Sequence, residues 1–249
     1  MKAKIPNIKL TGKEYNKLVF QTKIYTGGEG IICLSAKNSL YKIFTEYQSK
    51  IPIGLSDNKY SKIKELYSNP IEYMIRPLST ISLDDELIGY EMTYDKDDID
   101  LYNAKTNKKQ LITSLQQTSE ILKYFSSRDI TYGDVKANNI LLNKKTGQLK
   151  FCDIDNIRLG EYPIDLLHDQ IDSIVLDLDN IDETVDMYMH NLMTLQLLHD
   201  PKYDYDEILY NLSEGKYKEY YEKAAQETLD SMTEPAKFTK EYIIQYIKR

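Results

Sequence analysis

The apolar pattern of the chain changes its period near Lys108, and this change limits the folds open to it. Before Lys108, short segments rich in β-branched and aromatic residues alternate with turn residues, which is typical of strands. The first of these segments are Lys17–Tyr25, Gly30–Ala36 and Ser39–Phe44. After Lys108, apolar residues follow one helical stripe and predict a long amphipathic helix that ends near Ser127. We therefore expect an α+β protein, with most strands first and most helices after them.

One helix is expected within the strand-rich part. Apolar residues recur at helical spacing in Asp57–Ser68, and Asp57 is the expected N-cap. A hairpin around Leu83–Asp85 follows, so the first part is predicted to be a small antiparallel sheet with one helix. Asp97–Ala104 is interpreted as a polar connector or a short helix. Thr184–Leu198 and the segments from there to Arg249 are predicted to be helical.

Composition and charge argue against several classes of protein. The 249 residues are 41% hydrophobic and 29% charged, which favours a folded domain over a disordered chain. The net charge of −7 argues against a general nucleic-acid binder, since such proteins carry basic faces. Two cysteines are too few for a disulfide framework, so a reducing, cytoplasmic compartment is expected. The sequence offers no apolar run of about 18 residues and no secretory h-region, so we expect neither a membrane span nor a signal peptide.

The stretch Thr131–Leu142, "TYGDVKANNILL", places Asp134, Lys136 and Asn139 directly before an apolar run. Asp, Lys and Asn are poor strand formers, so we interpret the stretch as a polar loop that opens into a short buried strand. Asp153 follows Asn139 by fourteen positions (153 − 139), across a predicted hairpin. A loop can be polar simply because it is exposed, so the neighbouring segments decide what this one does.

Two features of the strand-rich part bear on that decision. Thr26–Gly30, "TGGEG", has three glycines in four positions, which suits either a phosphate-binding loop or a plain hairpin turn. Lys42 alternates with apolar neighbours in its predicted strand. Taken alone, it is either a ligand-binding lysine or a solvated strand residue.

In their order along the chain, these segments resemble the protein kinase family over nearly the whole length. "YTGGEGII" resembles the kinase glycine loop, "LYKIF" the strand with the phosphate-binding lysine, and "YGDVKANN" the catalytic loop H-R-D-x-K-x-x-N. "CDIDN" resembles the D-F-G loop, and "DMYMHNLM" is similar to the central buried helix of the second lobe. The resemblance implies a two-lobed protein kinase-like fold in one domain, 1–249. Residues 1–92 would form a small antiparallel β N-lobe with one helix, and 93–249 the hinge and a mostly α-helical C-lobe.

The resemblance also implies a nucleotide site for ATP. The residues that it assigns to this site are Gly27, Gly28, Gly30, Ile32, Lys42, Glu65, Glu91, Met92 and Asp153. Lys42 would hold the α- and β-phosphates, and Glu65 on the first-lobe helix would orient Lys42. The backbone at Glu91 and Met92, in the matching hinge segment, would bind adenine.

The catalytic residues implied in the same way are Asp134, Lys136 and Asn139. Asp134 would accept the proton of the substrate hydroxyl or orient that hydroxyl, and Lys136 would neutralise the γ-phosphate. Asn139 and Asp153 would ligate Mg²⁺, which prefers oxygen ligands. Asp186 would be buried and accept hydrogen bonds from the catalytic-loop backbone. A lysine two positions after the catalytic aspartate is the serine/threonine-kinase pattern, so the expected partner is a protein substrate with a Ser or Thr acceptor, with no nucleic acid and no membrane.

The chain departs from the family pattern in three places. Gly133 stands where the arginine of H-R-D is usual, Asp155 replaces the glycine of D-F-G, and no A-P-E follows Asp153. We interpret Asp155 as a polar loop residue rather than an extra metal ligand. Because "YGD" is also similar to the "HGD" loop of aminoglycoside and choline kinases, a small-molecule kinase is the second hypothesis. A nucleotide-binding pseudokinase scaffold is the third.

Overall fold

The computed structural model describes residues 4–47, 49–164, 185–187, 189–190, 193–194 and 197. The chain divides into two compact units. The first unit comprises residues 1–98 with 150–155, and the second comprises 99–149 with 156–249. The chain therefore leaves the first unit at strand β7 (Asp98–Asp100) and returns to it briefly at strand β10 (Leu149–Phe151).

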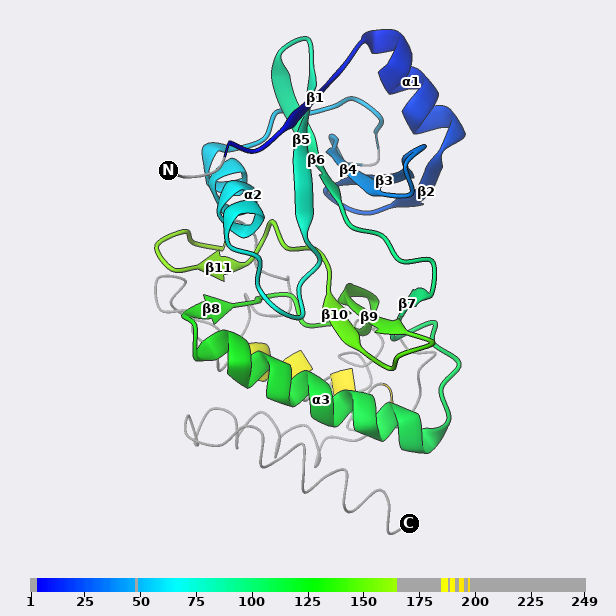
Figure 1. Ribbon diagram of the computed structural model, residues 1–249, viewed down its shortest axis with the longest axis vertical. Coiled ribbons are helices and arrows are strands. Elements are labelled where there is room, and N and C mark those ends of the chain that lie inside the picture. The colour runs from blue at the N-terminus through cyan, green and yellow to red at the C-terminus, as the bar shows by residue number, and fades with distance from the viewer. Residues whose placement is uncertain are drawn as a thin grey trace, which may run out of the picture. The chain divides into compact units, whose positions relative to one another are not determined.

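The first unit is built on a six-stranded sheet in the order β1-β5-β6-β4-β3-β2 (Figure 1). The strands are β1 (Asn7–Leu10), β2 (Lys23–Thr26), β3 (Gly30–Leu34), β4 (Leu40–Phe44), β5 (Pro77–Leu83) and β6 (Glu86–Met92). The predicted strands at β3 and β4 and the hairpin of β5 and β6 are confirmed. The sheet is not wholly antiparallel as predicted, because β1 pairs with β5 in parallel. This pair was missed because β1 is short and its partner lies about 70 residues away, so no local pattern marks it.

Helix α1 (Gly12–Gln21) corrects a second prediction, because its second half lies where we expected a strand from Lys17. Thr11 explains the helix: its side chain accepts a hydrogen bond from the Glu14 backbone, and the Glu14 carboxylate accepts one from the Thr11 backbone. This capping box starts a helix whose buried face carries Tyr15 and Val19. The first unit therefore contains two helices among its described residues, where one was predicted.

Helix α2 (Asp57–Ser68) has the bounds that the sequence predicted. Its N-cap is Ser56 rather than Asp57, because the Ser56 hydroxyl accepts a hydrogen bond from the Lys59 backbone. The buried face of α2 carries Ile63 and Leu66, as its apolar spacing requires, but it also carries Lys62. Burying a lysine costs free energy unless its ammonium group is paired with an anion or a hydrogen-bond acceptor. Lys62 therefore indicates that the buried face of α2 borders a polar site.

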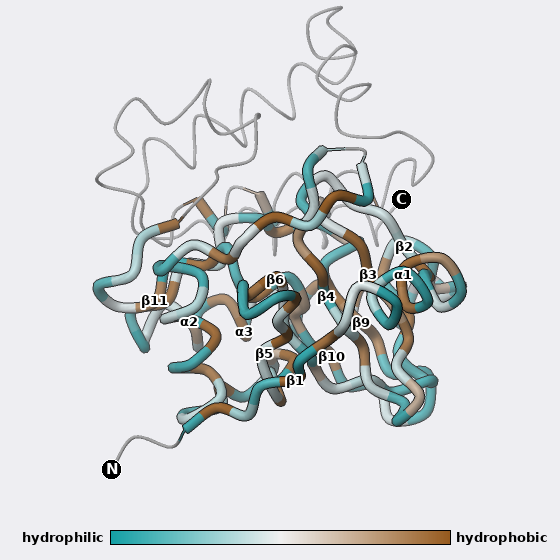
Figure 2. The backbone as a smooth tube through the Cα atoms, turned by 90° about the horizontal axis from the view of Figure 1, so that it is seen from above, coloured by the Kyte–Doolittle hydropathy of each residue, from teal (hydrophilic) through white to brown (hydrophobic). Residues whose placement is uncertain are grey.

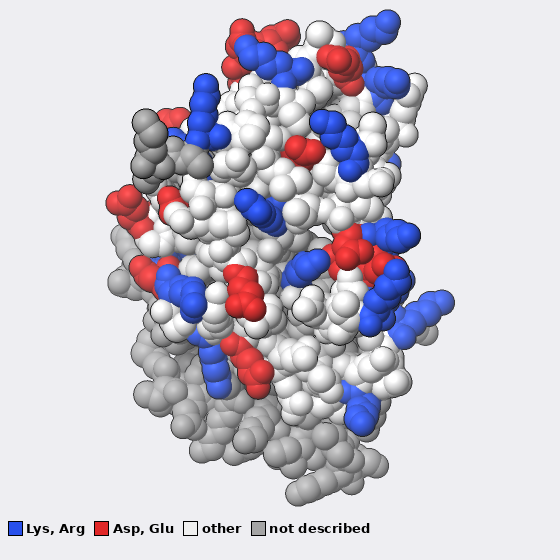
Figure 3. Space-filling view, in the orientation of Figure 1, with Lys and Arg blue, Asp and Glu red and all other residues white. Residues whose placement is uncertain are grey.

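The core of the first unit lies on the face of the sheet covered by α1. It consists of Tyr15, Val19, Ile31, Cys33, Ile43, Ile81 and Ile88. In Figure 2 hydrophobic stretches run along several of the strands, whereas many of the turns are hydrophilic. On the face shown in Figure 3, basic and acidic side chains are interspersed over the described residues. The apolar interior thus holds the strands β3, β4 and β6 that carry the residues of the candidate site.

The second unit contains helix α3 (Lys108–Ser126), which confirms the predicted long helix. Asn107 caps it through a capping box with Gln110. The remaining elements are β8 (Ile130–Thr131), the 3₁₀ helix η1 (Ala137–Asn139), β9 (Ile140–Asn143) and β11 (Arg158–Leu159), which pairs antiparallel with β8. Asp98–Asp100 is the strand β7, so our expectation of a connector or short helix there was wrong in part. The turn after β9 is closed by a hydrogen bond from the Asn143 backbone N–H to the Gln148 carbonyl.

The described residues establish a mixed α+β protein with one six-stranded sheet and a few helices. Residues 185–187, 189–190, 193–194 and 197 are helical, in agreement with the helix predicted over Thr184–Leu198. The helices predicted between residues 205 and 249 lie outside the described residues, so the mostly helical second lobe stays a prediction. Among the described residues, none of the helices is long and apolar enough to cross a membrane.

Candidate functional site

The second unit presents a polar loop between β8 and β9. Asp134 is its centre, and one carboxylate oxygen, Oδ2, accepts two hydrogen bonds from neighbours in the loop. Lys136 Nζ donates at 2.6 Å and Asn139 Nδ2 at 2.7 Å, and the same Nδ2 also donates to the Asp134 carbonyl at 3.1 Å. The three residues that the sequence singled out are therefore brought together. The turn of η1 accomplishes this, because it folds Asn139 back over the start of the loop.

The other carboxylate oxygen of Asp134, Oδ1, is buried and has no hydrogen-bond partner among the described residues. Buried polar atoms are nearly always paired, so an unpaired carboxylate oxygen is unusual, and it leaves Asp134 with one open acceptor position. The side chain of Asp134 as a whole is 13% exposed. Asp134 can thus accept a hydrogen bond from a hydroxyl or amine, beside the ammonium group of Lys136.

The backbone of this loop is fixed by Asp186, which is 1% exposed. Its two oxygens accept hydrogen bonds from the backbone N–H groups of Tyr132 and Gly133, both at 2.6 Å. The predicted role of Asp186 is therefore confirmed. Gly133 adopts φ = +78°, and a Cβ there would lie 2.7 Å from Cδ1 of Ile164. The position is suited to glycine on both counts.

In the first unit, Lys42 lies on β4 with only 6% of its surface exposed. Its Nζ forms ion pairs with Asp153 and, at 2.7 Å, with Asp155. It also lies 5.1 Å from the centroid of the Phe44 ring. Burial alone would lower the pKa of Lys42, but the two carboxylates outweigh burial and hold the pKa above its ordinary value. Lys42 is therefore a buried cation, and the interpretation of a solvated strand residue is wrong.

Asp155 is the most enclosed acid of this cluster, with no exposed surface. Its Oδ1 accepts hydrogen bonds from Lys42 and from the Tyr90 hydroxyl at 2.8 Å, and its Oδ2 accepts one from Lys59 at 3.3 Å. Burial acts to raise the pKa of Asp155, but Lys42 and Lys59 lower it to about 2. Our interpretation of Asp155 as a simple polar loop residue is therefore wrong: it is a buried, ionised acid.

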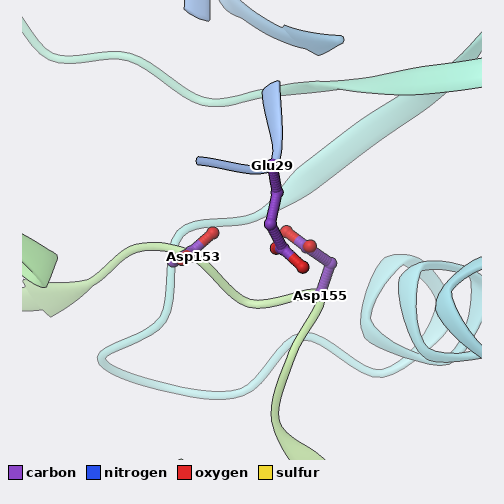
Figure 4. Close-up of side chains that lie close together, drawn as sticks. All are labelled: Glu29, Asp153 and Asp155. Carbon is purple, nitrogen blue, oxygen red and sulfur yellow. The ribbon is translucent and has the colours of Figure 1, made fainter. Parts of the chain in front are cut away.

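Glu29 completes a cluster of three acids, shown in Figure 4, whose side chains point toward one another. One oxygen each of Glu29, Asp153 and Asp155 lies within 4.8 Å of the others. Glu29 comes from the turn before β3 and pairs with Lys59 at 3.0 Å. Asp153 adopts φ = +61°, a conformation that Asp tolerates better than most residues, and its side chain is 28% exposed.

The residues present fit a hard cation such as Mg²⁺ unequally. Asp153 offers a carboxylate that is partly open to solvent, which suits a metal that keeps several waters. Both oxygens of Asp155 already accept hydrogen bonds from ammonium groups, so it is a poorer ligand. In the second unit, the Asn139 amide nitrogen is directed at Asp134, so its carbonyl oxygen is the atom that could ligate Mg²⁺.

Glu65 is not brought to Lys42. Among the described residues Lys42 pairs with Asp153 and Asp155, and the Glu65 carboxylate accepts a hydrogen bond from the Asn69 side chain at 2.7 Å. Glu65 lies half-buried in the last turns of α2, whereas Lys59 and Lys62 approach Asp155 from the same helix. The carboxylate that orients Lys42 in this structure therefore comes from the loop after β10 and not from α2.

The glycine segment forms the turn between β2 and β3. Gly27 N–H donates to the Gly30 carbonyl at 2.8 Å, which closes the hairpin. A Cβ at Gly30 would collide with the Ile43 carbonyl oxygen, so strand packing alone requires glycine there. Gly28 has open space around it, and Ile32 is paired with Lys42 across β3 and β4. Phosphate binding by this turn stays a prediction.

Glu91 and Met92 end strand β6, which lies between β4 and β5. The Glu91 carboxylate accepts hydrogen bonds from the hydroxyls of Ser39 and Ser79, which ties together the three strands that meet there. Met92 is buried. The structure thus gives Glu91 a structural role, and adenine binding by this segment stays a prediction.

Four residues of the cluster were missed by the sequence analysis: Glu29, Lys59, Lys62 and Tyr90. The signal for Lys62 was available, because it stands next to Ile63 on the apolar stripe of α2. Lys59, three positions before it, lies on the same face. Tyr90 and Glu29 carry no such signal, since only the pairing of the strands brings them to Asp155.

A comparison with protein-family models and with curated proteins finds no match for this chain.

Proposed function

We propose that the chain is an ATP- and Mg²⁺-dependent phosphotransferase, most closely matching a serine/threonine protein kinase. The observation that carries the proposal is the orphaned Oδ1 of Asp134, with Lys136 and Asn139 gathered on Oδ2. The proposal includes the two-lobed protein kinase-like fold, with 1–92 as N-lobe and 93–249 as hinge and C-lobe. The β sheet with α2, and α3 directly before the loop, support that arrangement.

Phosphoryl transfer depends on positioning and charge neutralisation more than on covalent catalysis. Asp134 accepts the hydrogen bond of the acceptor hydroxyl and so fixes the attacking oxygen. Lys136 neutralises negative charge that builds beside it during transfer. Asp186 holds the loop backbone, so that Asp134 meets the acceptor without reorganisation.

The cluster of the first unit would hold the nucleotide. Lys42 would bind phosphate oxygens, and Asp153 would ligate Mg²⁺, which supplies charge neutralisation when bound. Without ligand, Lys42 pairs with Asp155 and also forms an ion pair with Asp153. A phosphate group at Lys42 and a cation at Asp153 would replace that ion pair with two new ones, which keeps the buried charges balanced.

The test is transfer of label from γ-labelled ATP in the presence of Mg²⁺, with generic protein substrates. Phosphoserine or phosphothreonine in the substrate, lost in Asp134→Asn, supports the proposal. Asp134→Asn is the matched variant because it keeps the size of the side chain and removes its charge. Nucleotide binding by calorimetry with no transfer to any acceptor would instead support the pseudokinase hypothesis.

A small-molecule kinase is the second candidate, and Gly133 favours it. The loop requires a glycine here, because φ is +78° and Ile164 occupies the space of a Cβ. The protein kinase pattern has an arginine at this position, whereas the aminoglycoside and choline kinases that "YGD" is similar to have a glycine. ADP release that depends on added small alcohols or amines, and not on protein, would favour this candidate.

A further inference from the structure

Helix α2 directs cations, and not a carboxylate, at the site of Lys42. Lys62 has no exposed surface, and its Nζ donates to the Asp155 carbonyl at 3.4 Å. The side chain of Lys59 is 12% exposed, and its Nζ pairs with both Glu29 and Asp155. The kinase resemblance places an acid on this helix to orient the phosphate-binding lysine, so the charge of the helix face is reversed here.

The anion that balances the lysines of α2 is the carboxylate of Asp155. Its Oδ1 joins Lys42 to the Tyr90 hydroxyl, and its Oδ2 joins Lys59. Tyr90 is fully buried on β6, next to β4, and burial followed by the charge of Asp155 raises its pKa well above the ordinary value. Its hydroxyl is therefore a fixed donor that orients the carboxylate.

The two acids that meet Lys42 differ in their surroundings. Asp153 is 28% exposed and accepts from Lys42 through one oxygen, whereas Asp155 has no exposed surface and three side-chain donors. If Asp153 turns to a metal ion, Asp155 remains as the partner of Lys42. Two acids beside one lysine would repel each other, and Lys59 offsets the second negative charge.

We propose that Asp155 is the positioning residue for Lys42, held by Tyr90 and Lys59, in place of the acid of α2. The proposal rests on the proposed function, since the purpose of a positioned Lys42 is to bind the nucleotide phosphates. It accounts together for Asp155 in place of the D-F-G glycine and for the lysines on the buried face of α2. Glu65 has no part in orienting Lys42.

The test compares ATP with adenosine, because only ATP has phosphates for Lys42 to bind. Calorimetry with Mg²⁺ measures both affinities for the wild type, Asp155→Asn, Tyr90→Phe and the matched control Glu65→Gln. We expect Asp155→Asn to weaken ATP binding at least tenfold and adenosine binding less than twofold. Tyr90→Phe, which removes one donor and keeps the ring, is expected to weaken ATP binding two- to threefold. Glu65→Gln is expected to change neither.

The outcomes separate this proposal from the proposed function. Wild type that binds neither ligand overturns the proposed function, and the positioning role with it. If the wild type binds ATP, and ATP affinity is lost in Glu65→Gln and not in Asp155→Asn, the positioning role alone is overturned. Equal losses for ATP and adenosine in Asp155→Asn and in Tyr90→Phe also overturn it, since they indicate damage to the fold. Acylation of Lys42 by acetic anhydride, followed by mass spectrometry, tests the ion pair of Lys42 and Asp155 without nucleotide. We expect Lys42 to be labelled faster in Asp155→Asn and at an unchanged rate in Glu65→Gln. Faster labelling in Glu65→Gln and an unchanged rate in Asp155→Asn would contradict the pairing.

Discussion

Replacing Asp186 by asparagine should destabilise the polar loop of the second unit more than any isosteric replacement of a residue within the loop. The carboxylate accepts from the backbone of Tyr132 and Gly133 at 2.6 Å each and is 1% exposed. Hydrogen bonds to a charged group contribute about 1.5–3 kcal/mol each. Asparagine keeps one acceptor oxygen and turns an NH₂ group toward the second backbone N–H.

The expected cost follows from that geometry. One charge-assisted hydrogen bond becomes neutral, and one buried N–H loses its acceptor, so the free energy of unfolding should fall by about 3 kcal/mol. For a chain of this size that corresponds to a fall in Tm of roughly 6–12 °C. Asp186→Ala, which leaves both N–H groups without an acceptor, should cost more.

Thermal and urea unfolding followed by circular dichroism measure this cost. The matched control is Asp129→Asn: Asp129 adopts φ = +57°, which asparagine tolerates, and its side chain is 65% exposed in an ion pair with Arg158. A surface pair contributes at most ~1 kcal/mol, so the control should lower Tm by roughly 4 °C at most. Hydrogen exchange at the Gly133 amide should accelerate in Asp186→Asn and not in the control. A fall in Tm no larger than the control's, with unchanged exchange at Gly133, would refute the reasoning.

Three further outcomes are expected. Asp134→Asn should abolish transfer and leave ATP affinity within about twofold in calorimetry, whereas Asp153→Asn should remove the Mg²⁺-dependent part of binding; equal binding losses would contradict these roles. Gly133→Ala should lower the free energy of unfolding by ~2 kcal/mol in urea titrations, because the left-handed backbone costs ~1–2 kcal/mol for alanine and Ile164 must move; the double variant with Ile164→Ala should recover only the steric part. Burial lowers the pKa of His190 to about 4 from 6.5, so between these pH values the unfolded chain binds a proton that the folded chain does not. The free energy of unfolding should therefore fall by up to ~3 kcal/mol as pH drops from 6.5 to 4. His190→Gln should flatten this part of the stability profile against pH, and an unchanged profile would contradict the prediction.

Local sequence patterns were enough to predict the elements whose signal lies within one segment of the chain. Helix α3 and helix α2 follow from the spacing of their apolar residues, and the hairpin of β5 and β6 follows from two strand-like runs around Asp84. The polar loop around Asp134 could also be predicted, because its residues are separated by only a few positions and η1 closes them on one another. Helix α1 was missed because the run Lys17–Tyr25 resembles a strand, and the Thr11 capping box outweighs that preference.

The sequence by itself determined helices α2 and α3, the hairpin of β5 and β6 and the polar loop around Asp134, because residues a few positions apart fix them. Only the tertiary structure decided what surrounds Asp155. Its partners Lys42, Lys59 and Tyr90 lie 113, 96 and 65 positions away and come from β4, α2 and β6. A carboxylate in a loop is ordinarily solvated. This one is buried and ionised because the sheet and helix bring two ammonium groups and a hydroxyl to it, and no local pattern encodes that environment.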